Sequence, residues 1–263
     1  MHPSRRLAGM LLAATTGSVG AYQPFISDDT GTQGKSGNQL ELGFNRDRAQ
    51  QGGTTSTTHV IPFTYTRGLS DELDVFVSVN HTRLGSDFPG SDASGSGNPS
   101  VGFKWRFFEE EASKTSLAVK PELRLPVNSS KESAGLGNGR ASYGLALILT
   151  RETGFGAVHA NLAAGHDHYR GLPSSPGPDS EGWRASIAPV WDLNEQWKLA
   201  VDLGRETQRV GGIRNSAYYV ELGAVYSPDK DLDLAFGLIR RSDRTSPAVT
   251  TNTLTAGITW RFR

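Results

Sequence analysis

Apolar residues recur at every second position in twelve separate stretches of this chain. This period is typical of β-strands whose two faces meet different surroundings, and helical spacing is almost absent. The residues in between are polar, charged or small. The stretches are Leu40–Phe44, Ile61–Tyr65, Leu73–Val79, Val101–Phe107, Leu117–Leu125, Tyr143–Leu149, Val158–Ala164, Trp183–Trp191, Trp197–Leu203, Tyr218–Tyr226, Leu232–Leu238 and Leu254–Phe262. The pattern predicts twelve antiparallel strands. Pro62, Pro121 and Pro189 fall within the stretches, and we expect them at bulges or strand ends because proline lacks a ladder donor.

The connections between these stretches alternate between short and long. A soluble sandwich would also give alternating strands, but it would not explain this regularity. Short periplasmic turns and long extracellular loops are typical of outer-membrane barrels. The long connections, rich in Gly, Ser, Asp and Asn, are expected at 47–57, 81–98, 127–139, 166–181, 205–215 and 241–251. We therefore predict an all-β fold, a single 12-stranded antiparallel transmembrane β-barrel in the outer membrane of a Gram-negative-type bacterium.

The first residues have the three parts of a secretory signal. Arg5 and Arg6 give a charged start, residues 7–16 are apolar to small, and small residues lead to Ala21. We predict a signal peptide over residues 1–21, cleaved after Ala21. Residues 22–37 are then an N-terminal periplasmic or plug segment, and residues 38–263 form the barrel.

Composition narrows the function classes. The chain has no cysteine, which excludes disulfides and thiolate chemistry, and its 27 basic and 27 acidic residues provide no basic face for nucleic acid. Mean hydropathy is −0.41, and no later segment holds the roughly 20 apolar residues of a transmembrane helix. Without the signal peptide the chain carries 25 basic and 27 acidic residues, a net charge of −2.

Alternation also predicts which side chains face the barrel lumen. If the apolar set faces lipid, the residues between point inward, where charges of both signs avoid the cost of lipid contact. A closed network of ion pairs and an open aqueous path both fit such a lumen. We predict these lumen and selectivity residues: Lys104, Arg106, Lys120, Glu122, Arg124, Arg184, Lys198, Asp202, Glu221, Phe76 and Tyr219.

The polar stretch before the first strand has two interpretations. Its candidate plug residues are Asp28, Asp29, Thr30 and Thr32. In one interpretation the segment folds into the barrel mouth and its acids pair with lumen cations. In the other it is a periplasmic tail ordered by Asx turns.

The chain offers no convincing catalytic or metal-binding motif. Outer-membrane lipases need a serine and a histidine on the outer face, and the mid-strand His159 points inward by parity. A Gly-x-Ser-x-Gly elbow is also missing. His166-Asp167-His168 could bind a metal, but no third ligand is evident in the sequence. We predict no enzymatic activity, no metal site and no cofactor.

The stretch Gln23–Glu41, with Pro24 followed by Asp28-Asp29, is the most distinctive motif. It resembles the amino-terminal signature of the outer-membrane transporter family named for the meta-pathway of phenol degradation. Two further pieces, 97–107 and 120–126, are similar to that family as well.

The resemblance implies a barrel that passes small hydrophobic or aromatic solutes by passive diffusion. Its expected partners are outer-membrane lipid and lipopolysaccharide, the barrel-assembly machinery and the solutes, with no nucleic acid. The alternative is a structural or adhesion barrel with a closed lumen and binding loops.

Overall fold

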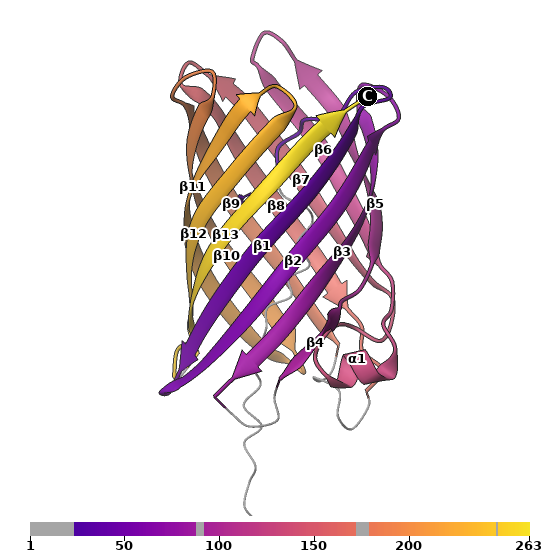
Figure 1. The fold of residues 1–263 in the computed structure, drawn as a ribbon, viewed down its shortest axis with the longest axis vertical. Coiled ribbons are helices and arrows are strands. Elements are labelled where there is room, and N and C mark those ends of the chain that lie inside the picture. The colour runs from indigo at the N-terminus through magenta and orange to yellow at the C-terminus, as the bar shows by residue number, and fades with distance from the viewer. Residues whose placement is uncertain (1–23, 88–91, 172–178, 246) are drawn as a thin grey trace, which may run out of the picture.

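The computed structural model describes residues 24–87, 92–171, 179–245 and 247–263. They form a closed antiparallel barrel with strongly tilted strands (Figure 1). The predicted signal peptide lies outside the described residues. The elements are β1 (Asn38–Gln51), β2 (Thr54–Gly68), β3 (Leu73–Ser86), β4 (Ala93–Ser96), β5 (Ser100–Glu110), β6 (Thr115–Arg124), α1 (Ser129–Ser133), β7 (Ser142–Thr153), β8 (Gly156–Asp167), β9 (Ser180–Asp192), β10 (Trp197–Val210), β11 (Ile213–Asp229), β12 (Leu232–Asp243) and β13 (Thr250–Phe262).

Twelve of these strands build the wall, which confirms the predicted fold. Each pairs with its sequence neighbours, and β1 pairs with β13 from Asn38↔Phe262 to Gln50↔Thr250 to close the barrel. The short strand β4, which the alternation did not predict, pairs with the end of β3. Closure gives each of the twelve wall strands two partners, so the wall has no open edge.

The two ends of the barrel differ as predicted. The short turns lie at the end where β1 begins and β13 ends, near the C-terminus in Figure 1. Two of the six expected long loops are instead tight hairpins, at Gly52-Gly53 and Gly211-Gly212. All four glycines have positive φ, which suits two-residue turns, so the strands continue past the apolar band. The connection 125–141 contains α1, and Glu132 within it is fully buried.

At each proline within a strand, the pairing with one neighbouring strand is interrupted and the pairing with the other neighbour is continuous. Pro62 pairs in register with Asn80 of β3, but the pairing of β1 with β2 is interrupted between Leu42↔Phe63 and Asn45↔Val60. Pro121 and Pro189 have equivalent gaps toward β5 and β10. The prediction of bulges or strand ends is wrong for these residues, because the register does not shift across any of the three gaps. A proline lacks one N–H group, so it removes a hydrogen bond to only one of the two neighbouring strands.

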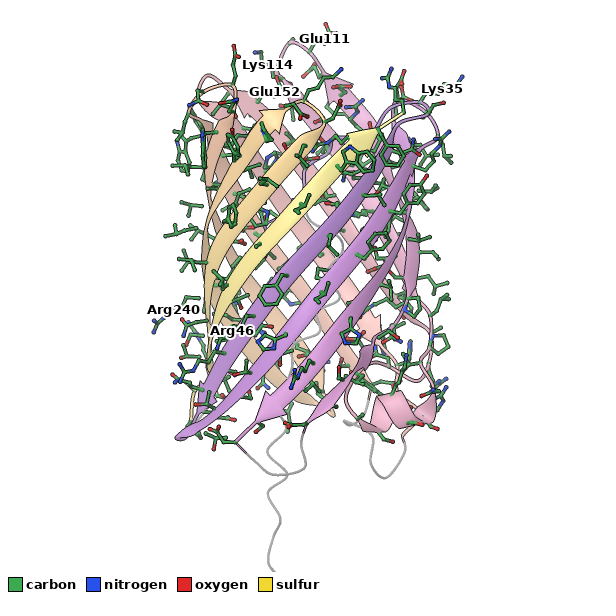
Figure 2. All side chains as sticks on the ribbon, in the orientation of Figure 1. Lys35, Arg46, Glu111, Lys114, Glu152 and Arg240 are labelled. Atoms are coloured by element: carbon green, nitrogen blue, oxygen red, sulfur yellow. The ribbon has the colours of Figure 1, made fainter. Side chains whose placement is uncertain are left out.

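Alternation separates an apolar outer face from a polar inner face. Leu222 is 56% exposed on the barrel exterior, whereas its neighbour Glu221 is fully buried inside. Figure 2 shows side chains projecting outward along the whole wall, with Arg46 and Arg240 toward the long-loop end. Aromatic pairs such as Trp260–Phe262, with ring centroids 4.7 Å apart, lie at the short-turn end. This is the arrangement expected of a band in contact with lipid and flanked by aromatic residues. No helix in the described ranges is long and apolar enough to span a bilayer.

Candidate functional site: the lumen and its N-terminal segment

Residues 24–37 run through the barrel interior from mid-lumen to the short-turn end; we call them the lumen segment. Phe25 is its apolar anchor, 4% exposed in a cluster with Val190, Ala200, Val225 and Ala235. Gly223 provides the room, since a Cβ there would lie 2.3 Å from the Phe25 ring. A small residue on the wall and an aromatic residue in the segment therefore fit together.

The backbone after Phe25 is held by acids of two neighbouring strands. The amide of Ile26 donates to Glu221 Oε2 at 3.2 Å, and the amide of Ser27 donates to Asp202 Oδ2 at 2.6 Å. Asp202 also accepts from the Tyr219 hydroxyl at 3.1 Å. From the adjacent strand β9, an Arg184 nitrogen donates to the Ile26 carbonyl at 3.4 Å. Four predicted lumen residues thus position two residues of the segment.

Asp28 is the charged centre of the segment. Its carboxylate lies 2.6 Å from Lys120 Nζ and 3.5 Å from Lys104 Nζ, and the side chains of Asp28 and Lys120 are each only 7% exposed. Its backbone makes two hydrogen bonds to the Asn161 side chain. The Asp28 carbonyl accepts from Asn161 Nδ2, and the Asp28 amide donates to Asn161 Oδ1 at 2.7 Å. Charge-assisted bonds with little access to water are the strong ones, so Asp28 fixes the segment against β5, β6 and β8.

The next residues combine a local turn with contacts to the wall. Asp29 lies 3.6 Å from Lys104 Nζ and accepts from the amide of Gly31 at 2.6 Å, which is an Asx turn. The Thr30 hydroxyl contacts the Ser116 hydroxyl at 2.5 Å. The Thr32 hydroxyl donates to the Asp71 carbonyl in the β2–β3 turn at 2.6 Å. The candidate plug residues thus all lie against the wall or its short-turn rim.

A cavity of about 290 Å³ remains beside the segment in the short-turn half of the lumen. The segment contacts β3 and β5 through β12, and its last residues bond to the end of β2. The cavity extends along the inner faces of β13, β1 and β2. Its lining combines charges of both signs, threonines and one aromatic ring. These residues are Asp28, Asp29, Gly31, Thr32, Gln33, Gln39, Glu41, Thr64, Thr66, Asp74, Phe76, Lys104, Lys120, Thr259 and Arg261.

Phe76 is the aromatic surface of this cavity. It is 5% exposed, and Lys120 Nζ lies 5.1 Å from the centroid of its ring, within cation–π range. Gly102 faces the ring, and a Cβ there would lie 2.4 Å from Phe76 Cζ. The cavity therefore joins one apolar ring to an ammonium group that is also held by Asp28.

Two of the other predicted lumen residues lie at the short-turn rim. Arg106 is near the short-turn rim, where it donates to the Asp71 carbonyl at 3.0 Å. Lys198 lies at the same end and pairs with Asp192 at 3.2 Å, both side chains at least 40% exposed. Both side chains are on the inner face of their strands, as alternation predicts, but they lie at the rim, where the barrel is open to solvent.

Two further predicted residues point inward from β6 at greater distance from the turns. Arg124 pairs with Asp167 at 2.6 Å toward the long-loop end, and both side chains are about 10% exposed. Glu122, 6% exposed, is adjacent to Gly144 on β7. Alternation identifies the face of a side chain but not its depth, so it grouped residues from both ends of the barrel.

Sequence reasoning missed several residues that hold the segment. The Asn161 side-chain oxygen accepts from the amide of Asp28, and the Thr150 hydroxyl accepts from the amide of Thr30 at 3.1 Å. The Asp74 carboxylate accepts from the amide of Gln33 at about 3 Å. Alternation places Asn161 and Asp74 on the inner face, but nothing in the sequence marks them as partners of the segment. Phe25 had no strand pattern around it to indicate burial.

Comparison with known proteins identifies the family. Residues 21–262 match the profile of the family described as "Putative MetA-pathway of phenol degradation". The chain belongs to this family. The match covers the lumen segment together with the whole barrel, so segment and wall are both part of the family's pattern.

Solved structures share the barrel. An outer membrane channel from Pseudomonas putida F1 is similar over 89% of this chain and 98% of that chain, with a TM-score of 0.74 at 16% identity. The beta domain of the Bordetella autotransporter BrkA is similar over 87% of this chain and 100% of that domain, with a TM-score of 0.56 at 15% identity. The translocator domain of the autotransporter NalP from Neisseria meningitidis is similar over 86% of this chain and 89% of that domain, with a TM-score of 0.53 at 11% identity. No curated protein sequence matches the chain. At these identities the likeness concerns the fold, that of an outer-membrane barrel.

Proposed function

We propose that this outer-membrane barrel passes small aromatic or hydrophobic solutes by passive diffusion, along the wall formed by β13, β1 and β2. The observation that carries the proposal is the cavity of about 290 Å³ between this wall and the lumen segment. It is at the small end of the range of about 300–1,000 Å³ that is usual for small-molecule sites. Family membership, and the description of a similar barrel as an outer membrane channel, support the same class of function.

The cavity lining offers an aromatic solute one ring and two ammonium groups, although its four acids outnumber its three bases. An aromatic acid could place its ring against Phe76 and its carboxylate toward Lys104 and Lys120. Glu41 and Asp74 line the same space, so the solute meets charges of both signs. A neutral sugar of similar size would gain less from the apolar ring. Such differences in lining groups are the usual source of selectivity in pores.

The lumen segment acts in this proposal as a plug that narrows the path. Phe25 and Asp28 hold it to one side of the lumen, and the cavity lies on the other side. A solute that moves through the barrel passes the segment or displaces part of it. Loss of the Asp28 carboxylate is therefore expected to raise flux.

The alternative is a structural or adhesion barrel with a closed lumen and binding loops. The observation in its favour is that the segment bonds to the wall at almost every residue from Ile26 to Gln33. A network of this kind can rigidify a barrel that conducts nothing.

Solute uptake into liposomes separates the two functions. Mature protein is reconstituted, and the entry of benzoate is compared with that of neutral sugars of similar size. Selective passage predicts faster benzoate entry, with the preference reduced several-fold by Phe76→Ala. Equal rates would indicate an unselective pore. If neither the wild type nor Asp28→Asn exceeds protein-free vesicles, the closed barrel is correct. Asp192→Asn, an acid of a solvent-exposed ion pair, is the matched control.

The envelope partners belong to the same proposal. The apolar outer band contacts outer-membrane lipid, with lipopolysaccharide around the long-loop end. The barrel-assembly machinery inserts the chain, guided by the aromatic C-terminal strand β13 with Trp260 and Phe262. Assembly of the Phe262→Ala variant in cells, followed by heat-modifiable migration on gels, is expected to be slower than that of the wild type.

A further inference from the structure

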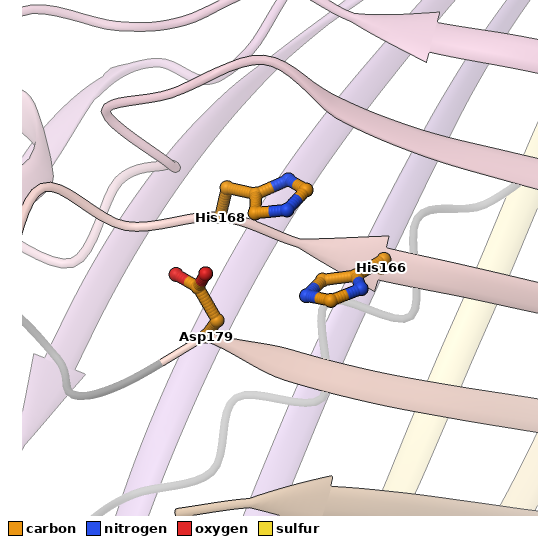
Figure 3. A group of neighbouring side chains, drawn as sticks. All are labelled: His166, His168 and Asp179. Carbon is orange, nitrogen blue, oxygen red and sulfur yellow. The ribbon is translucent and has the colours of Figure 1, made fainter.

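A second cluster of chemical groups lies on the outer rim, far from the lumen cavity. His166 and His168 at the end of β8 and Asp179 just before β9 have potential ligand atoms that all lie within 4.8 Å of one another. Figure 3 shows the three side chains converging from the two strand ends. In sequence, Asp179 is separated from the two histidines by the β8–β9 connection, so the pattern His166-Asp167-His168 gave no indication of it.

Asp167, between the two histidines, belongs to a different site. Its side chain points inward, where Arg124 lies 2.6 Å away and Asn138 Nδ2 donates at 2.9 Å. Alternation along β8 therefore directs the neighbouring histidines to the outside. The third ligand, Asp179, lies at the other end of the β8–β9 connection, just before β9 begins.

The tautomer of His168 is fixed in the form that binds metals. Its Nδ1 lies 2.9 Å from the Ala141 carbonyl oxygen, and this oxygen can only accept, so Nδ1 carries the proton. The lone pair is then on Nε2. A metal-binding histidine usually has this arrangement, with its other nitrogen donating to a carbonyl or carboxylate. The His168 amide also donates to the Ser142 hydroxyl at 2.9 Å, which holds the residue to β7.

The other two groups are positioned as well. The His166 ring stacks on the His168 ring with centroids 4.2 Å apart and planes at 11°, and Tyr143 contacts both rings at 5.7 Å. Asp179 Oδ1 accepts from the Tyr169 amide at 2.8 Å, which orients the carboxylate. Two imidazoles and one carboxylate therefore lie together at the mouth of the barrel, and one of the two stacked rings must turn before both can face the same ion.

We propose that His166, His168 and Asp179 bind one divalent first-row transition metal ion, with zinc as the reference ion. Imidazole ligands favour Zn²⁺, Ni²⁺ and Cu²⁺ over Mg²⁺ and Ca²⁺, which prefer oxygen. Ligand atoms about 2.0–2.1 Å from a tetrahedral zinc lie roughly 3.4 Å apart. The three ligand atoms, now within 4.8 Å of one another, must therefore approach by up to about 1.4 Å, and the stacked histidine rings must turn out of parallel, which rotations about the side-chain bonds allow. Water completes the coordination. The bound ion joins the end of β8 to the start of β9 on the exterior of the barrel, independently of what passes through the lumen.

Metal titration of the full protein, purified in detergent without a polyhistidine tag, tests the site. Zn²⁺ is titrated in competition with a chromogenic chelator. The wild type is expected to bind one ion per barrel, and His168→Ala and Asp179→Asn are each expected to bind at least tenfold more weakly. His59→Ala removes a rim imidazole that stacks on Phe44 and is expected to bind like the wild type. Heat-modifiable migration on gels verifies that each variant is folded.

Electron paramagnetic resonance of the Cu²⁺-loaded protein gives an independent readout. Coupling to two imidazole nitrogens is expected in the wild type and to one in His168→Gln. Equal affinity in the wild type, His168→Ala and Asp179→Asn would refute the site, and so would an equal loss in His59→Ala. A Cu²⁺ spectrum unchanged by His168→Gln would refute it as well.

Discussion

Replacing Asp28 with asparagine removes one negative charge from the centre of the lumen segment and preserves the size of the side chain. The carboxylate lies 2.6 Å from Lys120 Nζ, and both side chains are 7% exposed. Removing one partner of a buried ion pair costs about 3–5 kcal/mol. The backbone bonds to Asn161 survive, so we take the lower value of about 3 kcal/mol. At 1.4 kcal/mol per factor of ten, the displaced state of the segment becomes roughly a hundredfold more populated.

Thiol labelling measures this population directly. The chain has no cysteine, so Ser27→Cys introduces a unique thiol at a position that is 1% exposed. In the Asp28→Asn background a water-soluble methanethiosulfonate is expected to modify it about a hundredfold faster, in proportion to the open population. Conductance in planar bilayers is expected to rise in parallel. Adding Lys120→Met should restore part of the protection, because it removes the buried ammonium that has lost the Asp28 carboxylate.

The control and the refutation use the same assay. Asp192→Asn breaks the exposed pair with Lys198, worth at most about 1 kcal/mol, and is expected to leave labelling unchanged. If folded Asp28→Asn barrels are labelled at the wild-type rate, the ion pair does not hold the segment. The reasoning from burial and charge would then be wrong.

Two further substitutions test the packing. Gly223→Ala places a Cβ 2.3 Å from the Phe25 ring, so Phe25 must move. We expect this to destabilise the bound segment by about 1–3 kcal/mol and to speed thiol labelling of the Ser27→Cys variant. An unchanged labelling rate would contradict the role of Phe25 as the anchor. Leu147→Arg puts a charge on the outer face at the middle of β7, where the side chain is 48% exposed to the surroundings of the barrel. We expect it to lower the free energy of unfolding in lipid vesicles by about 2–4 kcal/mol. Leu193→Arg, in the β9–β10 turn, should change this energy by less than about 1 kcal/mol, and equal effects at both positions would rule out the assigned membrane band.

The sequence by itself determined the wall of the barrel. A strand side chain can face only lipid or lumen, so a period of two assigned the apolar outside and residues such as Asp202 and Glu221 inside. The twelve alternating stretches gave the number of strands that build the wall, and the regular connections indicated an outer-membrane barrel. Alternation did not reveal the hairpins at Gly52 and Gly211, because strands beyond the membrane lose the apolar signal and continue by backbone pairing alone.

Only the tertiary structure decided how distant residues meet. Ser27 and Asp202 are 175 residues apart, and their hydrogen bond depends on the closed barrel bringing the inner face of β10 to the segment. The same closure divides the lumen between the segment and the cavity beside Phe76. At the outer rim, Asp179 reaches His166 and His168 because antiparallel pairing aligns the two ends of the β8–β9 connection. Periodicity is a local property of the chain, whereas a site depends on register and closure, which involve the whole barrel.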